Sequence, residues 1–249
     1  MAYKQMAYVY DKLMEDAPYD KWIEFTESML EGNHVERIVD LGCGTGEITV
    51  RLAGKGFQMI GVDNSSDMLT YANNKATENK QNITWLHQDI RELEGLSNLD
   101  AAISYCDVIN YVTEEADLKE VFKRTFSSLK SGGLFLFDIH SLHQVENNYH
   151  NQTFADVLDD VSYIWFCTEG DEKGEMYHDL TFFVSDGQKY NRFDEIHHQR
   201  TYSITFYSNL LLKAGFSNIK VYADFSVIDN NIEENSERIF FVAEKARDH

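Results

Sequence analysis

From Arg37 onward, the hydrophobic positions of the chain alternate between two spacings. Short apolar runs rich in β-branched and aromatic residues read RIVDL, FQMIGVD, ITWLHQD, LDAAISY and LFLFDIH. Between them, the segments EITVRLAGKG, SSDMLTYANNKATENK and EEADLKEVFKRTFSSLK carry apolar residues at helical spacing. Strands that alternate with amphipathic helices are typical of βαβ units and a parallel sheet. LKSGG, just before the fifth apolar run, is expected to end the preceding helix with glycine stop signals.

The pattern changes after Leu142. VSYIWFCTEG, EMYHDLTFFVSDG and KYNRFDEIHHQRTYSI have the composition of three strands, and no long helix lies between them. They predict an antiparallel meander that is inserted as a β lid at about residues 148–200. SNLLLKAGF is expected to form a helix after the lid, and IKVYADF and SERIFFVAEK a closing pair of strands.

Two helical segments are expected ahead of the first strand, at about Met6–Met14 and Asp20–Glu31, with Asp20 as an N-cap. They would form an N-terminal helical cap over residues 1–31. The predicted fold is therefore a single α/β domain over residues 1–249. It consists of a Rossmann-like, seven-stranded, mostly parallel sheet with helices on both faces, plus the inserted antiparallel lid.

Composition narrows the possible classes of protein. Of the 249 residues, 43% are hydrophobic, which is enough for a packed core. The chain has 42 acidic and 22 basic residues, and its net charge of −20 argues against a nucleic-acid surface. The three cysteines form no C-x-x-C pair, so neither a disulfide framework nor a cysteine zinc site is expected. No signal-peptide or membrane-spanning pattern is present, which predicts a cytoplasmic protein, either a monomer or a homodimer.

Glycines follow the first predicted strand as GCGTG at positions 42–46, and a helix is expected next. Glycines permit a tight turn and let a ligand approach the backbone beside the unpaired N–H groups of a helix start. The spacing differs from the G-x-G-x-x-G of dinucleotide sites, and Glu47 would repel a diphosphate. Asp63 and Asp89 end the second and third runs, where carboxylates can accept hydrogen bonds from a ribose diol and an adenine amino group. Each acid alone is more often a turn or cap residue, but together with the glycines they predict a nucleotide-type cofactor.

With these motifs, the chain resembles the class I S-adenosylmethionine-dependent methyltransferases. VDLGCGTGE is similar to the glycine motif of that family, GVDNSSDML to its acidic ribose motif, HQDI to its adenine motif and LKSGGLFLFDIH to the approach to its fifth strand. The similarity covers about residues 39–140, and within the family the chain is similar to bacterial YqeM-like enzymes. It implies methyl transfer with S-adenosyl-L-methionine as cofactor. The candidate cofactor-binding residues are Tyr8, Asp40, Gly42, Cys43, Gly44, Asp63, Asn64, Met68, Asp89, Ile90 and Tyr105.

The resemblance also has implications for the N-terminal segment and for the segment after the fourth predicted strand. In similar enzymes the N-terminal segment closes over the cofactor, so Tyr8 or Tyr10 is expected to contact the methionine carboxylate, although packing of an N-terminal helix explains these tyrosines nearly as well. Amino-sugar N-methyltransferases are similar to this chain where it reads SYCDVINYV. Asp107 and Asn110 depart from the Ser/Gly-containing segment of those enzymes, so a sugar acceptor does not follow from the similarity.

The methyl acceptor is expected beyond the carboxyl ends of the fourth and fifth strands. Asp107 is a candidate to hold a cationic amine or to act as a base, and His140 is a candidate base at neutral pH. The competing interpretations are that Asp107 caps a helical turn and that His140 is a partly exposed loop residue. No metal is expected, because Asp138, His140 and His143 have no further ligand at metal-site spacing.

The predicted lid supplies the remaining candidates. His178 falls on the apolar face of the second lid strand and is expected to be a buried, hydrogen-bonded histidine. Tyr111, His198 and Arg200 are candidate substrate contacts, with Arg200 able to pair with an anionic group. An ordinary solvated strand face explains His198 and Arg200 equally well. The aromatic and histidine side chains of the lid favour a closed pocket, and hence a small-molecule acceptor methylated at nitrogen or oxygen.

Two other functions stay open. Tyr71 and Lys75 match the Y-x-x-x-K pattern of short-chain dehydrogenases, which suggests a nucleotide-dependent oxidoreductase. Their predicted helix lies far from the carboxyl edge of the sheet, where hydride transfer would occur, so we interpret the match as chance. The second alternative is a protein of this fold that binds the cofactor without turnover.

Overall fold

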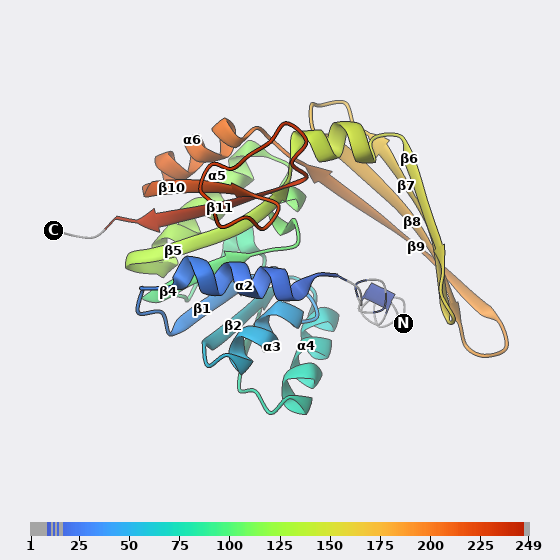
Figure 1. Ribbon diagram of the computed structural model, residues 1–249. Helices are drawn as coiled ribbons and strands as arrows, with labels where there is room; N and C mark the ends of the chain where they lie inside the picture. The colour runs from blue at the N-terminus through green and yellow to red at the C-terminus, as the bar shows by residue number, and fades with distance from the viewer. Residues whose placement is uncertain (1–8, 11, 13, 15–16, 247–249) are drawn as a thin grey trace.

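The computed structural model describes residues 9–10, 12, 14 and 17–246, and two sheets organise this part of the chain (Figure 1). Within it, sheet A has seven strands in the order β10-β11-β5-β4-β1-β2-β3. β11 runs antiparallel to both of its neighbours, and the other pairs are parallel. The strands are β1 (Arg37–Leu41), β2 (Gln58–Asp63), β3 (Thr84–His87), β4 (Leu99–Ser104), β5 (Leu129–His140), β10 (Phe216–Ala223) and β11 (Arg238–Lys245).

Helices cover both faces of sheet A because adjacent strand residues bury their side chains on opposite sides. Ile38 of β1 packs in an apolar cluster with α2 and α3, whereas Val39 packs in a second cluster with α5 and α6. The mostly parallel sheet between two helical layers confirms the predicted α/β class. The helices are α2 (Tyr19–Leu30), α3 (Glu47–Gly54), α4 (Ser66–Glu78), α5 (Glu115–Ser128) and α6 (Ile204–Ala214).

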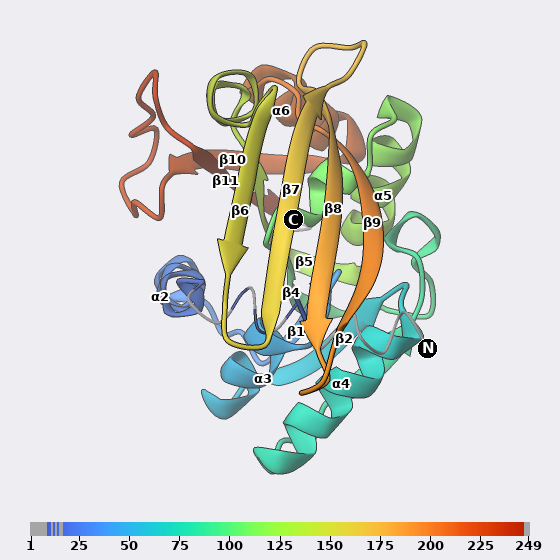
Figure 2. The same cartoon turned by 90° about the vertical axis from the view of Figure 1, so that its right-hand side faces the viewer.

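Sheet B is inserted between β5 and α6 and is antiparallel throughout, in the order β6-β7-β8-β9. Figure 2 shows its strands crossing in front of sheet A, on the side where the parallel strands of sheet A end. A short helix, η3 (Gln144–Tyr149), leads from β5 into it, and η1 (Ile90–Glu92) and η2 (Val108–Tyr111) follow β3 and β4. The strands of sheet B are β6 (Gln152–Val157), β7 (Val161–Glu169), β8 (Glu175–Ser185) and β9 (Tyr190–Arg200).

Several elements differ from the expectations. Sheet B has a fourth strand, Gln152–Val157, which was not predicted. This edge strand is mostly exposed and lacks the apolar alternation that would reveal it. Asp20 lies in the first turn of α2 instead of capping it, and Pro18 takes the N-cap position. LKSGG begins β5, since α5 already ends at Ser128. The segment predicted as the first helix lies mostly outside the described residues.

Candidate active site

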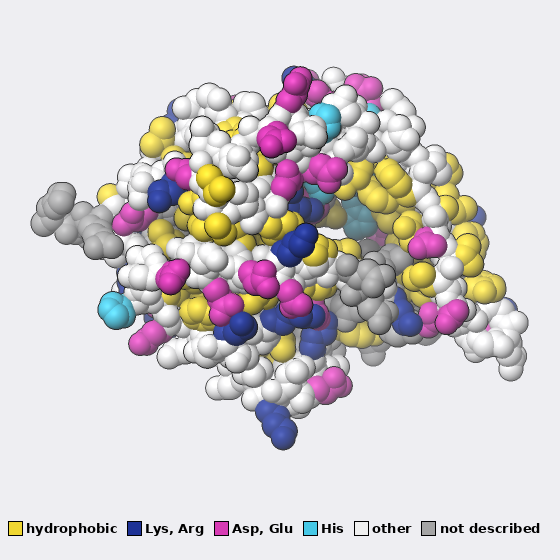
Figure 3. Space-filling view, viewed as in Figure 1, with side chains coloured by type: hydrophobic (Ala, Val, Ile, Leu, Met, Phe, Trp, Pro, Cys, Tyr) yellow, Lys and Arg dark blue, Asp and Glu magenta, His cyan; other side chains and the backbone are white. Residues whose placement is uncertain are grey.

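A cavity of about 590 Å³ lies at the carboxyl edge of sheet A. The loops after β1, β2, β3 and β4 form it, and a histidine of sheet B completes one wall. Figure 3 shows the surface hollowed beside the apolar side chains of sheet B. Of the predicted site residues, those that line the cavity are Asp40, Gly42, Cys43, Gly44, Asp63, Asn64, Met68, Asp89, Ile90, Tyr105, Asp107 and Tyr111.

Three glycines shape the loop after β1. Gly42, Gly44 and Gly46 have φ values of +77°, +53° and +78°, which side chains other than glycine rarely adopt. A Cβ on Gly42 would overlap the Val108 side chain, and one on Gly46 would lie 2.9 Å from Ala72 Cβ. At Gly44 a Cβ would meet nothing within 4 Å. Two glycines therefore permit close packing of the loop, whereas Gly44 leaves backbone open beside the cavity.

Two carboxylates stand behind the glycine loop. Asp40 is 3% exposed and accepts a hydrogen bond from Thr49 Oγ1 at 2.6 Å. Burial, opposed by this hydrogen bond and reinforced by the charge of Asp63, raises the pKa of Asp40 to about 7. Asp63 accepts from Gly44 N and Ser65 N, both at 2.8 Å, so it joins the loop to the start of α4. Burial raises the pKa of Asp63 as well, although these backbone donors oppose the rise.

The third acid, Asp89, is held by its neighbour. Arg91 Nη2 donates to Asp89 Oδ2 at 2.6 Å, and Arg91 Nε contacts both carboxylate oxygens at 3.0 Å. Hydrogen bonding from this guanidinium lowers the pKa of Asp89. Asp89 also accepts from Arg91 N, which starts η1 and sets Ile90 in the cavity wall. The carboxylate predicted to face an adenine therefore already carries an ionic partner.

The charged side chains that line the cavity indicate which kind of cofactor it can bind. Within the described part of the chain, its wall carries five acidic side chains and one guanidinium, that of Arg91, which is bonded to Asp89. Glu47, at the start of α3, is occupied by Lys75 at 2.6 Å and Arg51 at 2.7 Å. An acidic wall suits a ligand with cationic groups and disfavours a diphosphate. Lys75, the lysine of the Y-x-x-x-K pattern, is thus paired with Glu47. The pattern therefore has no role in a dinucleotide site.

Asp107 lies at the other end of the cavity, after β4. It adopts left-handed backbone geometry with φ +54° and occupies the N-cap position of η2, but its side chain does not cap that helix. Instead, Asp107 Oδ1 contacts His140 Nε2 at 3.3 Å and Arg238 Nη2 at 3.2 Å, and Oδ2 accepts from Gln199 Nε2 at 2.9 Å. Burial raises the pKa of this carboxyl, but His140, Arg238 and Gln199 outweigh burial and hold the pKa well below its usual range. The helix-cap interpretation was therefore wrong, and Asp107 is an ionised group with three donors in place.

A second buried carboxylate supports the first. Asp138 is fully buried, and its Oδ2 accepts from Arg238 Nη1 and Trp22 Nε1, both at 2.8 Å. Its Oδ1 accepts from the backbone N of Asp107 at 2.9 Å. Since every partner of Asp138 is a donor, it is a carboxylate. Arg238 thus bridges two anions, and the three side chains together carry one net negative charge.

His140 is 7% exposed and ends β5, so the interpretation as a partly exposed loop residue was wrong. Its backbone N donates to Asn110 Oδ1 at 2.9 Å, and its ring meets Tyr149 edge to face. His140 is not among the residues that line the cavity, and its Nε2 is directed at Asp107. The described geometry therefore makes His140 a partner of Asp107 and not a group at the cavity surface.

A chain of hydrogen bonds runs from sheet B to Asp107. Trp165 Nε1 donates to His178 Nδ1 at 2.9 Å, so the proton of the neutral imidazole lies on Nε2. His178 Nε2 then donates to Gln199 Oε1 at 3.1 Å, which turns the amide nitrogen of Gln199 toward Asp107. Burial lowers the pKa of His178 to about 4. His178 is 6% exposed, which confirms the prediction of a buried, hydrogen-bonded histidine.

Strand β9 turns alternate side chains toward the cavity and away from it. His197 lines the cavity, and Gln199 on the same face reaches Asp107. His198 bonds Glu175 at 2.7 Å and stacks on Tyr177, and Arg200 bonds Glu172 at 3.1 Å. The structure thus places the two predicted substrate contacts of this strand outside the cavity wall.

The aromatic residues of the site have distinct positions. Tyr105 is 2% exposed, and its hydroxyl bonds Thr26 Oγ1 at 2.9 Å, so only its ring is available to the cavity. Tyr111 Oη bonds His197 Nδ1 at 3.2 Å. Tyr10 lines the cavity, whereas Tyr8 lies outside the described residues.

Three functional candidates were missed from the sequence, namely His197, Gln199 and Arg238. The sequence of β9 has no clean apolar alternation, so no local signal assigned His197 and Gln199 to the inner face. No local signal marks Arg238, since its partners Asp107 and Asp138 lie 131 and 100 residues away.

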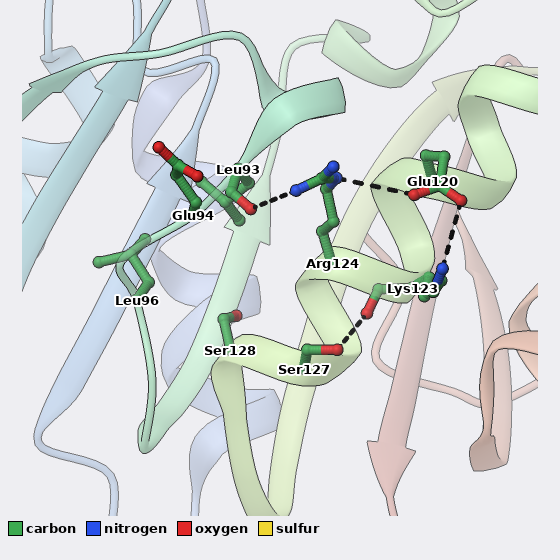
Figure 4. A pocket seen from close by; sticks show the side chains of 8 residues that line it. All are labelled: Leu93, Glu94, Leu96, Glu120, Lys123, Arg124, Ser127 and Ser128. Atoms are coloured by element: carbon green, nitrogen blue, oxygen red, sulfur yellow. Dashed lines mark hydrogen bonds and ion pairs between the residues drawn. The ribbon is translucent and has the colours of Figure 1, made fainter.

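A second hollow of about 360 Å³ lies between α5 and the loop after η1, away from the glycine loop (Figure 4). Arg124 Nη1 donates to Leu93 O at 3.1 Å, and Arg124 Nε lies 3.7 Å from Glu120. These contacts are structural and bring no reactive pair together. Among the described residues, no group of three His, Cys, Asp or Glu is arranged to hold a metal ion, and no helix is long and apolar enough to cross a membrane.

The fold and the cavity define a class I methyltransferase, and comparison with known proteins agrees. Residues 38–133 match the family model described as methyltransferase domain. A candidate methyltransferase of Geobacillus is 43% identical, covering 98% of this chain and all of that protein. The candidate methyltransferase YqeM of Bacillus subtilis is also 43% identical, covering 99% of this chain and 98% of that protein.

A solved structure extends the likeness to three dimensions. An S-adenosylmethionine-dependent methyltransferase from Clostridium acetobutylicum aligns with a TM-score of 0.88 and 32% identity, covering 99% of this chain and 100% of that one. The chain therefore belongs to the S-adenosylmethionine-dependent methyltransferases. It is an enzyme of that class with S-adenosyl-L-methionine as its cofactor, and the oxidoreductase alternative falls away.

Proposed function

We propose that this enzyme methylates a small-molecule acceptor, and that the acceptor atom is an amine nitrogen. The observation that carries the proposal is the ionised Asp107 at one end of a cavity sized for a cofactor and a compact molecule. A fixed anion beside the reaction centre favours an acceptor that arrives with a positive charge. An alcohol would bring no positive charge to this carboxylate.

The chain's own residues divide the cofactor among them. We assign Asp40, Gly42, Cys43 and Gly44 to its methionine part, Asp63 and Asn64 to its ribose, and Met68, Asp89 and Ile90 to its adenine. Tyr105 and Tyr10 also line the cavity, and its acidic wall suits the ammonium and sulfonium charges. When bound, S-adenosylmethionine supplies an electrophilic methyl group on its sulfonium.

Asp107 and His140 have different tasks in this proposal. Asp107 accepts a hydrogen bond from the acceptor and orients it, since a carboxylate with so low a pKa is a weak base. His140 and Gln199 fix the Asp107 carboxylate from behind. Catalysis by such a site comes mainly from alignment and exclusion of water.

Sheet B supports a small acceptor. It stands beside the cavity and contributes His197 to the wall, so we assign it the role of a lid. On the face shown in Figure 3, Lys and Arg side chains are scattered among acidic ones and form no basic stripe. With a net charge of −20, this surface is unsuited to a nucleic-acid backbone.

The test is turnover of S-adenosylmethionine labelled in its methyl group against a fractionated extract of small metabolites. The expected result is a labelled amine formed by the wild-type enzyme and at least tenfold less by Asp107→Asn, with unchanged affinity for S-adenosylhomocysteine. Label appearing on an alcohol oxygen would refute the nitrogen assignment. Label appearing only on added RNA would refute a small acceptor, and binding without any transfer would favour the alternative of a protein without turnover.

A further inference from the structure

His197 is the imidazole that faces the cavity near Asp107. It lies two residues before Gln199 on β9, and Gln199 donates to Asp107 Oδ2 at 2.9 Å. Residues two apart on a strand point to the same face. The histidine that lines the cavity and the carboxylate that we assign to the acceptor therefore share one wall.

Tyr111, which also lines the cavity, contacts the ring of His197. Its hydroxyl lies 3.2 Å from His197 Nδ1, and the two rings meet edge to face with centroids 5.8 Å apart. When Nδ1 carries the proton and donates it to Tyr111, the lone pair of the neutral imidazole lies on Nε2. The 3.2 Å contact also fits the other tautomer, in which the Tyr111 hydroxyl donates to a bare Nδ1. A proton acceptor at Nε2 requires the first arrangement, in which Tyr111 accepts from Nδ1–H.

The groups around His197 determine its charge. The charge of Asp107 acts on it, and His178 is its partner across the β8–β9 ladder. Burial lowers the pKa of His197 from its usual value of 6.5, and the anionic Asp107 opposes this only in part. At neutral pH the imidazole is therefore uncharged and has a lone pair to offer.

We propose that His197 accepts the proton of the acceptor amine, with Tyr111 as its positioning residue. The inference rests on the proposed function and adds the route of the proton. The amine enters as an ammonium and donates one N–H to Asp107. A second N–H bond breaks, its proton passes to His197 Nε2, and its electron pair stays on nitrogen. The products are an imidazolium and a neutral amine whose lone pair can attack the methyl group.

The first experiment does not depend on turnover. The full chain is labelled with ¹⁵N-histidine, saturated with S-adenosylhomocysteine and titrated by ¹H–¹⁵N NMR, with His197→Asn used to assign the signal. The expected result is a proton on Nδ1 of His197, a pKa below 6.5, and a shift toward the Nε2–H tautomer in Tyr111→Phe. A proton on Nε2 in the wild type, or a cationic His197 at pH 7, would overturn the proposal.

The second experiment measures transfer to benzylamine as a probe amine and to any amine identified from the extract. His197→Asn is expected to lower kcat by about 10²-fold at pH 7, the lower end of general-base effects. The loss should shrink as pH rises above the pKa of the amine, because solvent then removes the proton. A structural defect would give the same loss at every pH, and that outcome, like full activity at pH 7, contradicts the proposal.

His198→Asn is the matched control, because His198 is the neighbouring histidine on the opposite face and pairs with Glu175. It is expected to keep wild-type turnover and pH profile. Equal losses in the two variants would mean that sheet B is merely disturbed, which also contradicts the proposal. If the wild type methylates no amine, the proposed function fails, whereas the NMR measurement still decides the tautomer and charge of His197.

Discussion

The affinity for the cofactor should depend on pH through Asp40. This carboxyl is buried, receives one hydrogen bond from Thr49 and lies within the field of Asp63. Its pKa is about 7, so near neutral pH a large fraction of the enzyme holds a neutral Asp40. A ligand with an ammonium group binds best to the ionised form, and binding should expel the proton.

The size of the effect follows from proton competition. If only ionised Asp40 is competent, the apparent Kd rises by the factor 1 + 10^(pKa − pH). With a pKa of about 7, this factor is about 2 at pH 7 and about 100 at pH 5. The apparent Kd should therefore increase by roughly 50-fold between pH 7 and pH 5, and change little between pH 8 and pH 9 on account of this group.

Isothermal titration calorimetry with S-adenosylhomocysteine measures this effect directly. Titrations at pH 5 to 8 give the Kd, and buffers of different ionisation enthalpy count the protons released. Asp40→Asn should bind more weakly at pH 7 and lose most of the pH dependence, with Asp63 accounting for the remainder. A wild-type Kd that is constant from pH 5 to 8, or a pH dependence that survives in Asp40→Asn, would refute the reasoning.

Three further predictions concern the supports of the site. Arg238→Met leaves the buried carboxylates of Asp107 and Asp138 uncompensated and should lower the free energy of unfolding by about 3–5 kcal/mol; a loss under about 1 kcal/mol in urea titrations at pH 7 would contradict this. His178 has a pKa near 4, below its usual 6.5, so its contribution to stability is complete above pH 6.5 and is lost as pH falls through 4. In His178→Gln, the melting temperature should therefore fall less steeply as the pH is lowered than in the wild type. An unchanged pH dependence would exclude His178 as its origin. Gly42→Ala should destabilise the fold by more than about 1 kcal/mol because it meets Val108 and requires φ +77°, whereas Gly44→Ala should spare Val108 and chiefly weaken cofactor binding; equal unfolding midpoints for the two variants would contradict the difference.

The predictable parts of the protein are those that depend on the spacing of residues close together in the sequence. Alternation of β-branched runs with amphipathic helices determines the α/β layers, because each element must bury its own apolar face. The glycine loop at 42–46 and the acids at strand ends, Asp63 and Asp89, lie at short and regular offsets along the chain. In a parallel sheet the loops that follow the strands lie at the same edge, and this does not depend on the other contacts of the fold.

Only the tertiary structure decided what surrounds Asp107. Asp107 takes its donors from His140, Gln199 and Arg238, which are 33, 92 and 131 residues away. Burial of such a network depends on pairing of β5 with β11 in sheet A and of β8 with β9 in sheet B, for which the local sequence holds no signal. The sequence therefore could not decide between the roles considered for Asp107 and His140. The observed contacts place Asp107 in the cavity wall and His140 behind it.

The choice between His197 and His198 shows the same limit on a smaller scale. Both residues are histidines, and the polar sequence around them lacks the apolar alternation that would assign a face. Pairing of His178 with His197 in the β8–β9 ladder sets the register, and the β pleat then turns His197 inward and His198 outward. Local hydrophobic spacing thus determined the framework and the glycine loop, whereas long-range strand pairing determined which side chains surround Asp107.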